Sequence, residues 1–442
     1  MRNLVNCDFG SFIEKWRVQS LGNGIALSIK EFSVTAKDLA DVLQSFTNRR
    51  KLFRLSLDGI YGLDGSASIW TPLLQNLTEL QELELRDCSL QIADIEHLAA
   101  ALGQVPNLAN LNLSKNGNLG GNAETWAASL QSMIHLKKLD MSNCSINSRD
   151  LKYIAESVSP MRNLVDCDFS SYPEVWRVQS LGNGIEMSIE RFSLTAKDLA
   201  DVLQSFTNRR KLFRLSLDGI YGLDGSASIW TPLLQNLTEL QELEIRDCSL
   251  QIADIEHIAA ALGQMPNLAD LNLSRNEELG GNAKTWAASL RKMIHLNSLN
   301  LSKCAINEQD LPHIASSVGE MPNLTDLNLS RKWGLGGSAE IWTPPLQNMT
   351  ELRELNLIRC SLQSTDIEHI AAAVSRMPTV ESLSLVGNDS LRGFAQTWAR
   401  CLNQMKHVSS LKLGGCALTK EDKKHISEAW GSGVDFESSE DD

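Results

Sequence analysis

The stretch Leu80-Gln81-Glu82-Leu83-Glu84-Leu85-Arg86-Asp87-Cys88-Ser89-Leu90 decides the fold, because its leucines alternate with other residues from the fourth position onward. This alternation is typical of a short β-strand with one buried face. The following residues change to helical spacing, since Ile95, Leu98 and Leu102 fall on one side of a helix. The segment 80–107 therefore predicts one strand and one helix, which cannot bury their apolar faces without stacked neighbours.

The same pattern recurs through nearly the whole chain of 442 residues. Full units of 28 residues begin at 24, 52, 80, 108, 136, 184, 212, 240, 268, 296, 324, 352, 380 and 408, and shorter units of 20 residues occupy 4–23 and 164–183. A longer repeat is superimposed, because 35–84 is identical to 195–244, a displacement of 160 residues. The sequence predicts a single solenoid over 1–435, followed by an acidic disordered tail at 436–442.

Two forms of the unit alternate. One reads L-x-x-L-x-L-x-x-C-x-L, as in 80–90, and the other reads L-x-x-L-x-L-x-x-N-x-x-L-G-G, as in 108–121. These motifs resemble leucine-rich repeats of the ribonuclease-inhibitor type. Runs such as Leu119–Ala127 are similar to the repeat arrays of invertebrate chordate proteins related to nucleotide-binding-domain leucine-rich-repeat receptors. The resemblance implies an α/β solenoid, a right-handed βα horseshoe with a parallel sheet on the concave face and helices on the convex face.

Residue types that commonly build active sites fall into fixed columns of the repeat. Counting from the leucine that opens each unit, six cysteines hold position 9, all eight histidines hold positions 18 or 28, and six tryptophans (Trp70, Trp126, Trp230, Trp286, Trp342 and Trp398) hold position 19. An aspartate at position 15 follows Thr or Asn at position 12 in several units, which resembles a helix capping box. We therefore expect buried thiols, core indoles and capping carboxylates. No catalytic residue, metal site or cofactor is expected.

Composition narrows the partner classes. The chain has 41 Lys and Arg against 54 Asp and Glu, a formal net charge of −13, whereas nucleic acids and anionic membranes require a basic surface. It has no apolar run long enough to span a bilayer, no signal-peptide pattern and no nucleotide-binding glycine motif. We therefore expect a cytoplasmic protein that binds neither nucleic acid nor membrane.

The outward strand positions remain as the candidate binding surface, because packing already explains the core columns. Asp140, Asp166, Asp168, Glu186 and Glu190 are expected to form an acidic patch on consecutive strands. A second candidate patch combines the loop residue Trp333 with an apolar spot made by Ile358 and Val386. The acidic patch would suit a basic protein ligand, and the second patch a hydrophobic anchor.

These features favour a non-enzymatic scaffold that binds a protein on its concave face. The resemblance to receptor arrays implies a sensing module of innate-immune type. Alternatives are an inhibitor of a basic ribonuclease and a leucine-rich-repeat regulator that activates GTPases. Met1-Arg2-Asn3 matches the end of a unit, so we also expect a fragment of a longer receptor whose uncapped N-terminal edge self-associates.

Overall fold

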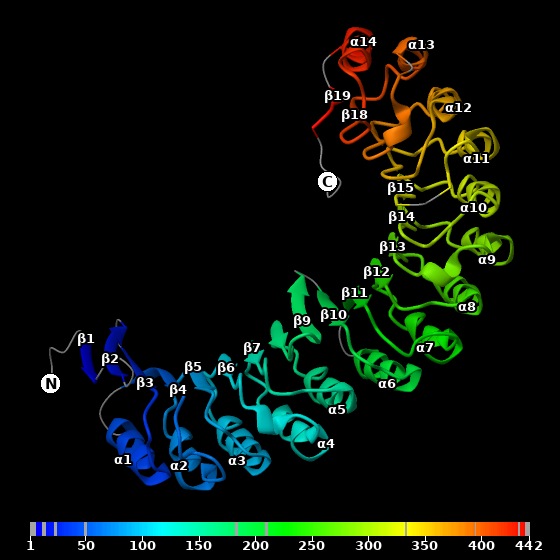
Figure 1. The fold of residues 1–442 in the computed structure, drawn as a ribbon. Coiled ribbons are helices and arrows are strands. Elements are labelled where there is room, and N and C mark those ends of the chain that lie inside the picture. The colour runs from blue at the N-terminus through cyan, green and yellow to red at the C-terminus, as the bar shows by residue number, and fades with distance from the viewer. Residues whose placement is uncertain are drawn as a thin grey trace. The chain divides into compact units, whose positions relative to one another are not determined.

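The computed structural model describes residues 6–10, 15–21, 24–47, 51–181, 184–207, 211–331, 334–393, 395–431 and 434–437. They belong to two compact units, residues 1–213 and 214–442. Within each unit the strands form one layer and the helices another (Figure 1). The strand–helix repeat predicted from the leucine pattern is thus present in both units, and its architecture is that of an α/β leucine-rich-repeat solenoid.

The first unit alternates strands and helices along the chain. Its elements are β1 (Asn6–Gly10), β2 (Lys15–Leu21), β3 (Gly24–Lys30), α1 (Ala36–Thr47), β4 (Leu52–Asp58), α2 (Ala67–Leu74), β5 (Glu82–Arg86), α3 (Ile92–Leu102), β6 (Asn110–Asn112), η1 (Gly117–Leu119), α4 (Ala123–Trp126), η2 (Ala127–Ser132), β7 (Lys138–Asp140), α5 (Ser148–Val158), β8 (Asp166–Asp168), β9 (Val175–Leu181), β10 (Gly184–Glu190) and α6 (Ala196–Phe206). Strands β3 to β8 are parallel, each paired with the next.

Each of the two 20-residue units contributes an antiparallel strand and no helix among its described residues. Strand β2 pairs antiparallel with β1 and β3, and β9 pairs antiparallel with β8 and β10. The side chains of β9 alternate, because Trp176 and Val178 are buried and Arg177 and Gln179 are exposed. The Trp176 ring packs against Phe169, with ring centroids 4.8 Å apart.

The second unit continues the pattern with parallel pairing between successive strands from β11 to β19. Its elements are β11 (Leu212–Asp218, which begins at the border), α7 (Ala227–Leu234), β12 (Glu242–Arg246), α8 (Ile252–Leu262), β13 (Asp270–Asn272), η3 (Glu277–Leu279), α9 (Ala283–Leu290), β14 (Ser298–Asn300), α10 (Leu311–Val318), β15 (Asp326–Asn328), α11 (Ala339–Leu346), β16 (Glu354–Asn356), α12 (Ser364–Val374), β17 (Ser382–Ser384), η4 (Asp389–Leu391), α13 (Ala395–Gln404), β18 (Ser410–Lys412), α14 (Lys420–Trp430) and β19 (Val434–Asp435).

The predicted core columns are buried between the two layers. Five of the six column tryptophans are fully buried, and the side chain of the sixth, Trp398, lies outside the described residues. The indole of Trp126 donates a hydrogen bond from Nε1 to the Leu119 carbonyl at 3.0 Å. The six cysteines of position 9 are buried as well.

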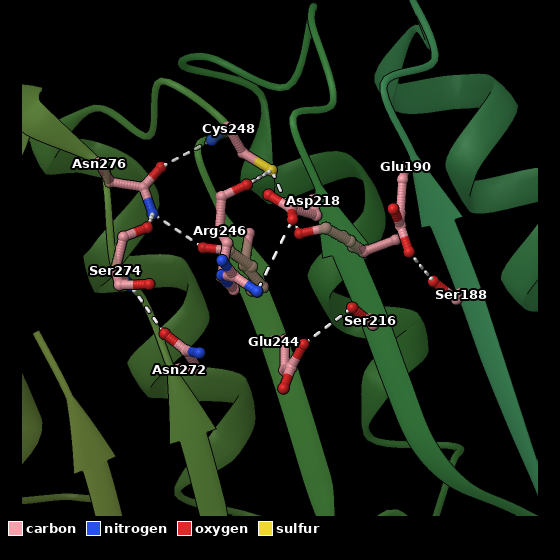
Figure 2. A network of polar contacts seen from close by, with 12 residues as sticks. Ser188, Glu190, Ser216, Asp218, Glu244, Arg246, Cys248, Asn272, Ser274 and Asn276 are labelled. Atoms are coloured by element: carbon pink, nitrogen blue, oxygen red, sulfur yellow. Dashed lines mark hydrogen bonds and ion pairs between the residues drawn. The ribbon is translucent and has the colours of Figure 1, made fainter. Parts of the chain in front are cut away.

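At Cys88, Cys248 and Cys360, a buried asparagine amide of the next repeat joins the two repeats just after the strand, as Figure 2 shows for Cys248. The Asn276 side chain accepts hydrogen bonds from the N–H groups of Cys248 and Leu250 at 3.0 and 3.2 Å and donates to the Ile245 carbonyl at 2.8 Å. The Cys248 thiol donates to the Arg246 carbonyl at 3.1 Å. The thiols therefore stabilise the turn between strand and loop by hydrogen bonding to it, and the turn buries them.

The aspartate column caps helices, as predicted, and it also joins successive units. Asp150 accepts from Asn147 N–H at the start of its own helix at 3.0 Å. The same carboxylate accepts from Gly121 and Ala123 N–H groups of the preceding unit at 2.7 and 2.9 Å. Asp94, Asp254, Asp310, Asp366 and Asp422 repeat this bridge to the preceding unit.

The start of the predicted tail is placed in the structure. Phe436 and Glu437 follow β19 in a bend, and the Lys423 ammonium lies 5.3 Å from the centre of the Phe436 ring. The Glu437 N–H donates to Asp435 Oδ1 at 2.8 Å. Residues 438–442, for which disorder was predicted, lie outside the described residues.

Replacing Asp150 by Ala should lower the free energy of unfolding by about 3 kcal/mol, because three backbone N–H groups lose a charged acceptor at a buried site. Urea denaturation followed by circular dichroism would measure the loss. Asp38→Ala is the matched control, since Asp38 is exposed and bonds only to Thr35 in the described contacts, so its loss should be smaller. Equal losses would contradict the bridging role.

The enclosed thiols should make the protein less stable in alkali. Burial raises the pKa of Cys88, Cys144 and Cys248 to about 12, from an ordinary value of 9.0. The unfolded chain therefore loses these protons first, so stability should be constant below pH 9 and fall between about pH 9 and 12. The slope of unfolding free energy against pH should decrease in Cys88→Ala by up to about 1.4 kcal/mol per pH unit. An unchanged slope would contradict this assignment.

Candidate functional site

A recess of about 400 Å³ lies on the strand face of the first unit. We call it the recess, and its walls come from the consecutive strands β5 to β9. Its charged lining residues are Glu82, Glu84, Lys138, Asp140, Asp166, Asp168 and Arg177. Carboxylates thus outnumber cations five to two, and the recess is acidic.

Strand register positions these side chains in two rows. One row runs through Glu84, Asn112, Asp140, Asp168 and Arg177, which are successive Cα partners across the five strands. Adjacent strands lie about 4.8 Å apart, so groups in one row are within reach of one another. The leucines between them point to the opposite side and are buried, so the rows are held by the core.

Two cations partly neutralise the acidic groups, and an amide donates a hydrogen bond to one of them. Arg177 Nε lies 3.1 Å from Asp168 Oδ2, and Lys138 Nζ lies 3.4 Å from Asp166 Oδ2. Asn112 Nδ2 donates to Asp140 Oδ2 at 3.0 Å. Such half-exposed pairs are weak in water. A basic group on a partner can therefore compete for these carboxylates.

The predicted acidic patch is divided, which corrects one expectation. Asp140, Asp166 and Asp168 line the recess, but Glu186 and Glu190 lie on β10, and β9 is inserted between β8 and β10. The five acids are therefore not on consecutive strands. Glu190 accepts a hydrogen bond from the Ser188 hydroxyl at 2.9 Å (Figure 2).

The predicted apolar spot is not exposed. Ile358 is 5% exposed and Val386 is 1% exposed. Strand β16 ends at Asn356 and β17 at Ser384, so both residues lie in the turn after the strand instead of on its outward face. The expectation that they form a surface anchor was wrong. Trp333, the third member of that patch, lies outside the described residues.

The sequence analysis missed residues of the β8–β9 hairpin. Tyr172 is 91% exposed in the connection between the two strands, and Arg177 and Gln179 of β9 line the recess. The signal was present, because Trp176 to Gln179 alternates apolar and polar residues as a strand does. The hairpin places an exposed aromatic ring beyond the last strand pair of the recess.

The histidine columns do not contribute to the recess. His97, His257, His313 and His369 are exposed on α3, α8, α10 and α12, in the helix layer. Throughout the described ranges, no group of three or more His, Cys, Asp or Glu side chains is arranged to hold a metal ion. Nor does any described helix have the length and apolar character needed to cross a membrane.

Comparison with known proteins identifies the class of repeat. The chain is 28% identical to ribonuclease inhibitor of Sus scrofa over 267 residues, which are 57% of this chain and 58% of that protein. It is 22% identical to human NACHT, LRR and PYD domains-containing protein 14, over 54% of this chain and 23% of that protein. The chain thus spans little more than half of the first relative and about a quarter of the second. No family model matches the chain.

The fold is shared with a solved leucine-rich-repeat protein of Leptospira interrogans, with a TM-score of 0.50 and 17% identity over 93% of this chain and 95% of that one. That likeness concerns the fold alone. The chain therefore has the leucine-rich-repeat fold, and its alternating Cys-type and Asn-type units are similar to ribonuclease inhibitors and to proteins that combine NACHT domains with leucine-rich repeats.

Proposed function

We propose that the chain is a non-enzymatic scaffold that binds a basic segment of a partner protein in the recess of the first unit. The observation that supports the proposal is the excess of carboxylates over cations among the residues that line the recess. A Lys or Arg side chain of the partner would meet Glu84 and Asp140 in one row, with Asp168 on the next strand. Complementary charge of this kind favours rapid and specific association.

The shape of the surface favours a polypeptide over a small molecule. The rows present outward groups from five strands, and ten of the thirteen lining residues are polar or charged, whereas small-molecule sites are enclosed and lined mostly by apolar side chains. The exposed ring of Tyr172 adds an aromatic group in the connection that leads from β8 to β9, and aromatic residues often anchor protein interfaces.

We propose further that the scaffold works in the cytoplasm as a sensing module of innate-immune type. The support is the similarity to the repeats of human NACHT, LRR and PYD domains-containing protein 14. An acidic strand face would then select ligands by charge.

The charge requirement can be measured with the full chain and a fluorescently labelled decapeptide of alternating Lys and Ser. Asp140→Asn combined with Asp168→Asn should weaken peptide binding about tenfold at low salt, because two carboxylates leave the recess. Fluorescence anisotropy reports the affinity. Both substitutions introduce a residue that strands of the second unit carry at the same position of the repeat, as Asn300 and Asn328 show.

A charge-matched control lies on the helix layer of the same unit. Glu96→Gln combined with Glu156→Gln removes two exposed carboxylates from α3 and α5 without altering the recess. Its affinity for the basic peptide should equal that of the unmodified chain. If both double variants weaken binding to the same extent, the attraction is a property of net charge and the proposed site is wrong.

Inhibition of a basic ribonuclease is the second candidate, because the acidic recess occurs in a chain that resembles pig ribonuclease inhibitor. If the chain acts in this way, an excess of it should reduce the rate at which pancreatic-type ribonuclease cleaves a fluorogenic RNA substrate. The Asp140→Asn and Asp168→Asn double variant should then inhibit less. Full ribonuclease activity at micromolar concentrations of the unmodified chain would exclude this candidate while leaving the scaffold proposal to the peptide assay.

A further inference from the structure

Four successive repeats of the second unit carry a cation at one equivalent position. These residues, which we call the rim row, are Arg275, Lys303, Arg331 and Arg359, and each is the eighth residue of its unit. All four have a left-handed backbone, with φ between 51° and 64°. The row is unusual in a chain whose formal net charge is −13.

Backbone hydrogen bonds hold the rim row in register. The N–H of Arg275 donates to the Ser302 carbonyl at 2.9 Å, and the N–H of Lys303 donates to the Ser330 carbonyl at 3.2 Å. Each bond joins one unit to the next, so the cations follow the strand spacing of about 4.8 Å. The row therefore extends about 14 Å, close to the length of four or five extended residues.

The fold does not require cations at this position. The equivalent residues of the other full repeats also have positive φ but differ in charge: Glu31, Gly59, Asp87, Lys115, Asn143, Arg191, Gly219, Asp247, Gly387 and Gly415. Glycine and asparagine adopt this backbone conformation more easily than Arg or Lys. The backbone conformation therefore does not explain why four successive repeats carry a cation at this position.

The cations of the rim row repel one another. Burial lowers the pKa of Lys303, and the nearby charges of Arg275 and Arg331 lower it further. In the part of the chain that the structure describes, neither Arg275 nor Lys303 has an ion pair with a carboxylate. Grouped positive charges of this kind are stabilised when an anionic ligand lies over them.

Amide groups lie beside the rim row on the same strands. Asn272, Asn300, Asn328 and Asn356, which we call the amide row, are successive Cα partners on β13 to β16. Each Oδ1 accepts from the N–H two residues later, as Asn272 does from Ser274 at 3.0 Å (Figure 2). This bond occupies the oxygen and leaves the half-buried amide nitrogen as a donor, for which no acceptor is found among the described residues.

We propose that the rim row and the amide row together bind an extended acidic segment of a partner protein. Carboxylates of the segment would lie over the four cations, and its backbone carbonyls would accept from the asparagine amides. The ligand charge is opposite to that expected for the recess, and the residues belong to the other unit. This site is therefore independent of the proposed function.

A protein segment fits better than a nucleic acid. Asp270, Asp326 and Glu354 lie on the same strands, and Glu277 and Glu278 lie in η3, the element that comes after β13. Burial and the neighbouring Glu242 raise the pKa of Asp270, so this side of the surface already carries crowded negative charge. A long polyanion would meet these acids as well as the cations, whereas a short acidic run can lie on the row alone.

The test uses the full chain and a fluorescently labelled hexaglutamate peptide in anisotropy titrations. Binding should weaken as salt is raised, and Arg275→Asn and Lys303→Asn should each reduce affinity about threefold, with about a tenfold loss in the double variant. Asparagine occupies the equivalent position at Asn143 with φ 56°, so the turn can keep its conformation. Arg275→Lys, which copies Lys115, should retain nearly full affinity.

The matched control is Lys115→Asn, because Lys115 holds the position of Arg275 in the first repeat block but stands between Asp87 and Asn143 in its column. It should leave hexaglutamate binding unchanged, as should the double substitution of Asp140 and Asp168 that tests the recess. The proposal is overturned if Lys115→Asn weakens binding as much as Arg275→Asn does, or if the double rim variant binds normally. Equal affinity for a labelled octauridine RNA, lost in the same variants, would instead assign the row to nucleic acid.

Discussion

The repeat depends on a carboxylate shared between two helix starts. The short helix α4 belongs to an Asn-type repeat, and its N-cap residue Asn122 makes no side-chain capping hydrogen bond. Asp150 of the following repeat instead accepts hydrogen bonds from the backbone N–H groups of Gly121 and Ala123 at this helix start. In the turn that follows the strand, the Asn116 side chain accepts a hydrogen bond from the Cys88 N–H of the preceding repeat. Each repeat is therefore completed by its neighbouring repeats through hydrogen bonds as well as apolar packing. These contacts fix the register between successive strands within each of the two compact units.

Fixed register turns the outward positions into rows whose chemistry is set by sequence alone. The two repeat blocks share the same framework, yet Asp140 in the first corresponds to Asn300 in the second, and Asn143 corresponds to Lys303. The strand position that carries Asp140 in the recess thus carries an amide of the amide row in the second block, and the turn position that carries Asn143 carries a cation of the rim row. Duplication of the scaffold has been followed by divergence of its surface, while the buried columns have remained the same.

Much of the fold could be predicted because the buried columns repeat so often. The leucine alternation, the indole and thiol columns and the capping aspartates are all confirmed wherever the structure describes them. The β9 strand was not predicted, because the 28-residue period indicates a helix after each strand. The alternation of Trp176 and Val178 with polar residues is nevertheless typical of a strand. Ile358 was assigned to the surface because position 7 faces outward in a long strand, whereas β16 ends two residues earlier. Which outward residues lie together in the candidate site depends on where each strand ends and which strands are neighbours. The repeat period alone does not specify either property.

Strand β9 also changes the local bending of the first unit. Solenoids of this kind curve because a helix is about 10 Å wide and a strand occupies about 4.8 Å. Strand β7 precedes helix α5, and strand β10 precedes helix α6. The two helices pack directly against each other, whereas β8 and β9 lie between the two strands. Three strand spacings, about 14 Å, here stand against one helix width of about 10 Å, so the strand layer is locally the wider of the two. The recess has β9 as its last wall, so it lies where the strand layer is wider than the helix layer behind it, a local arrangement that opposes inward curvature of the sheet.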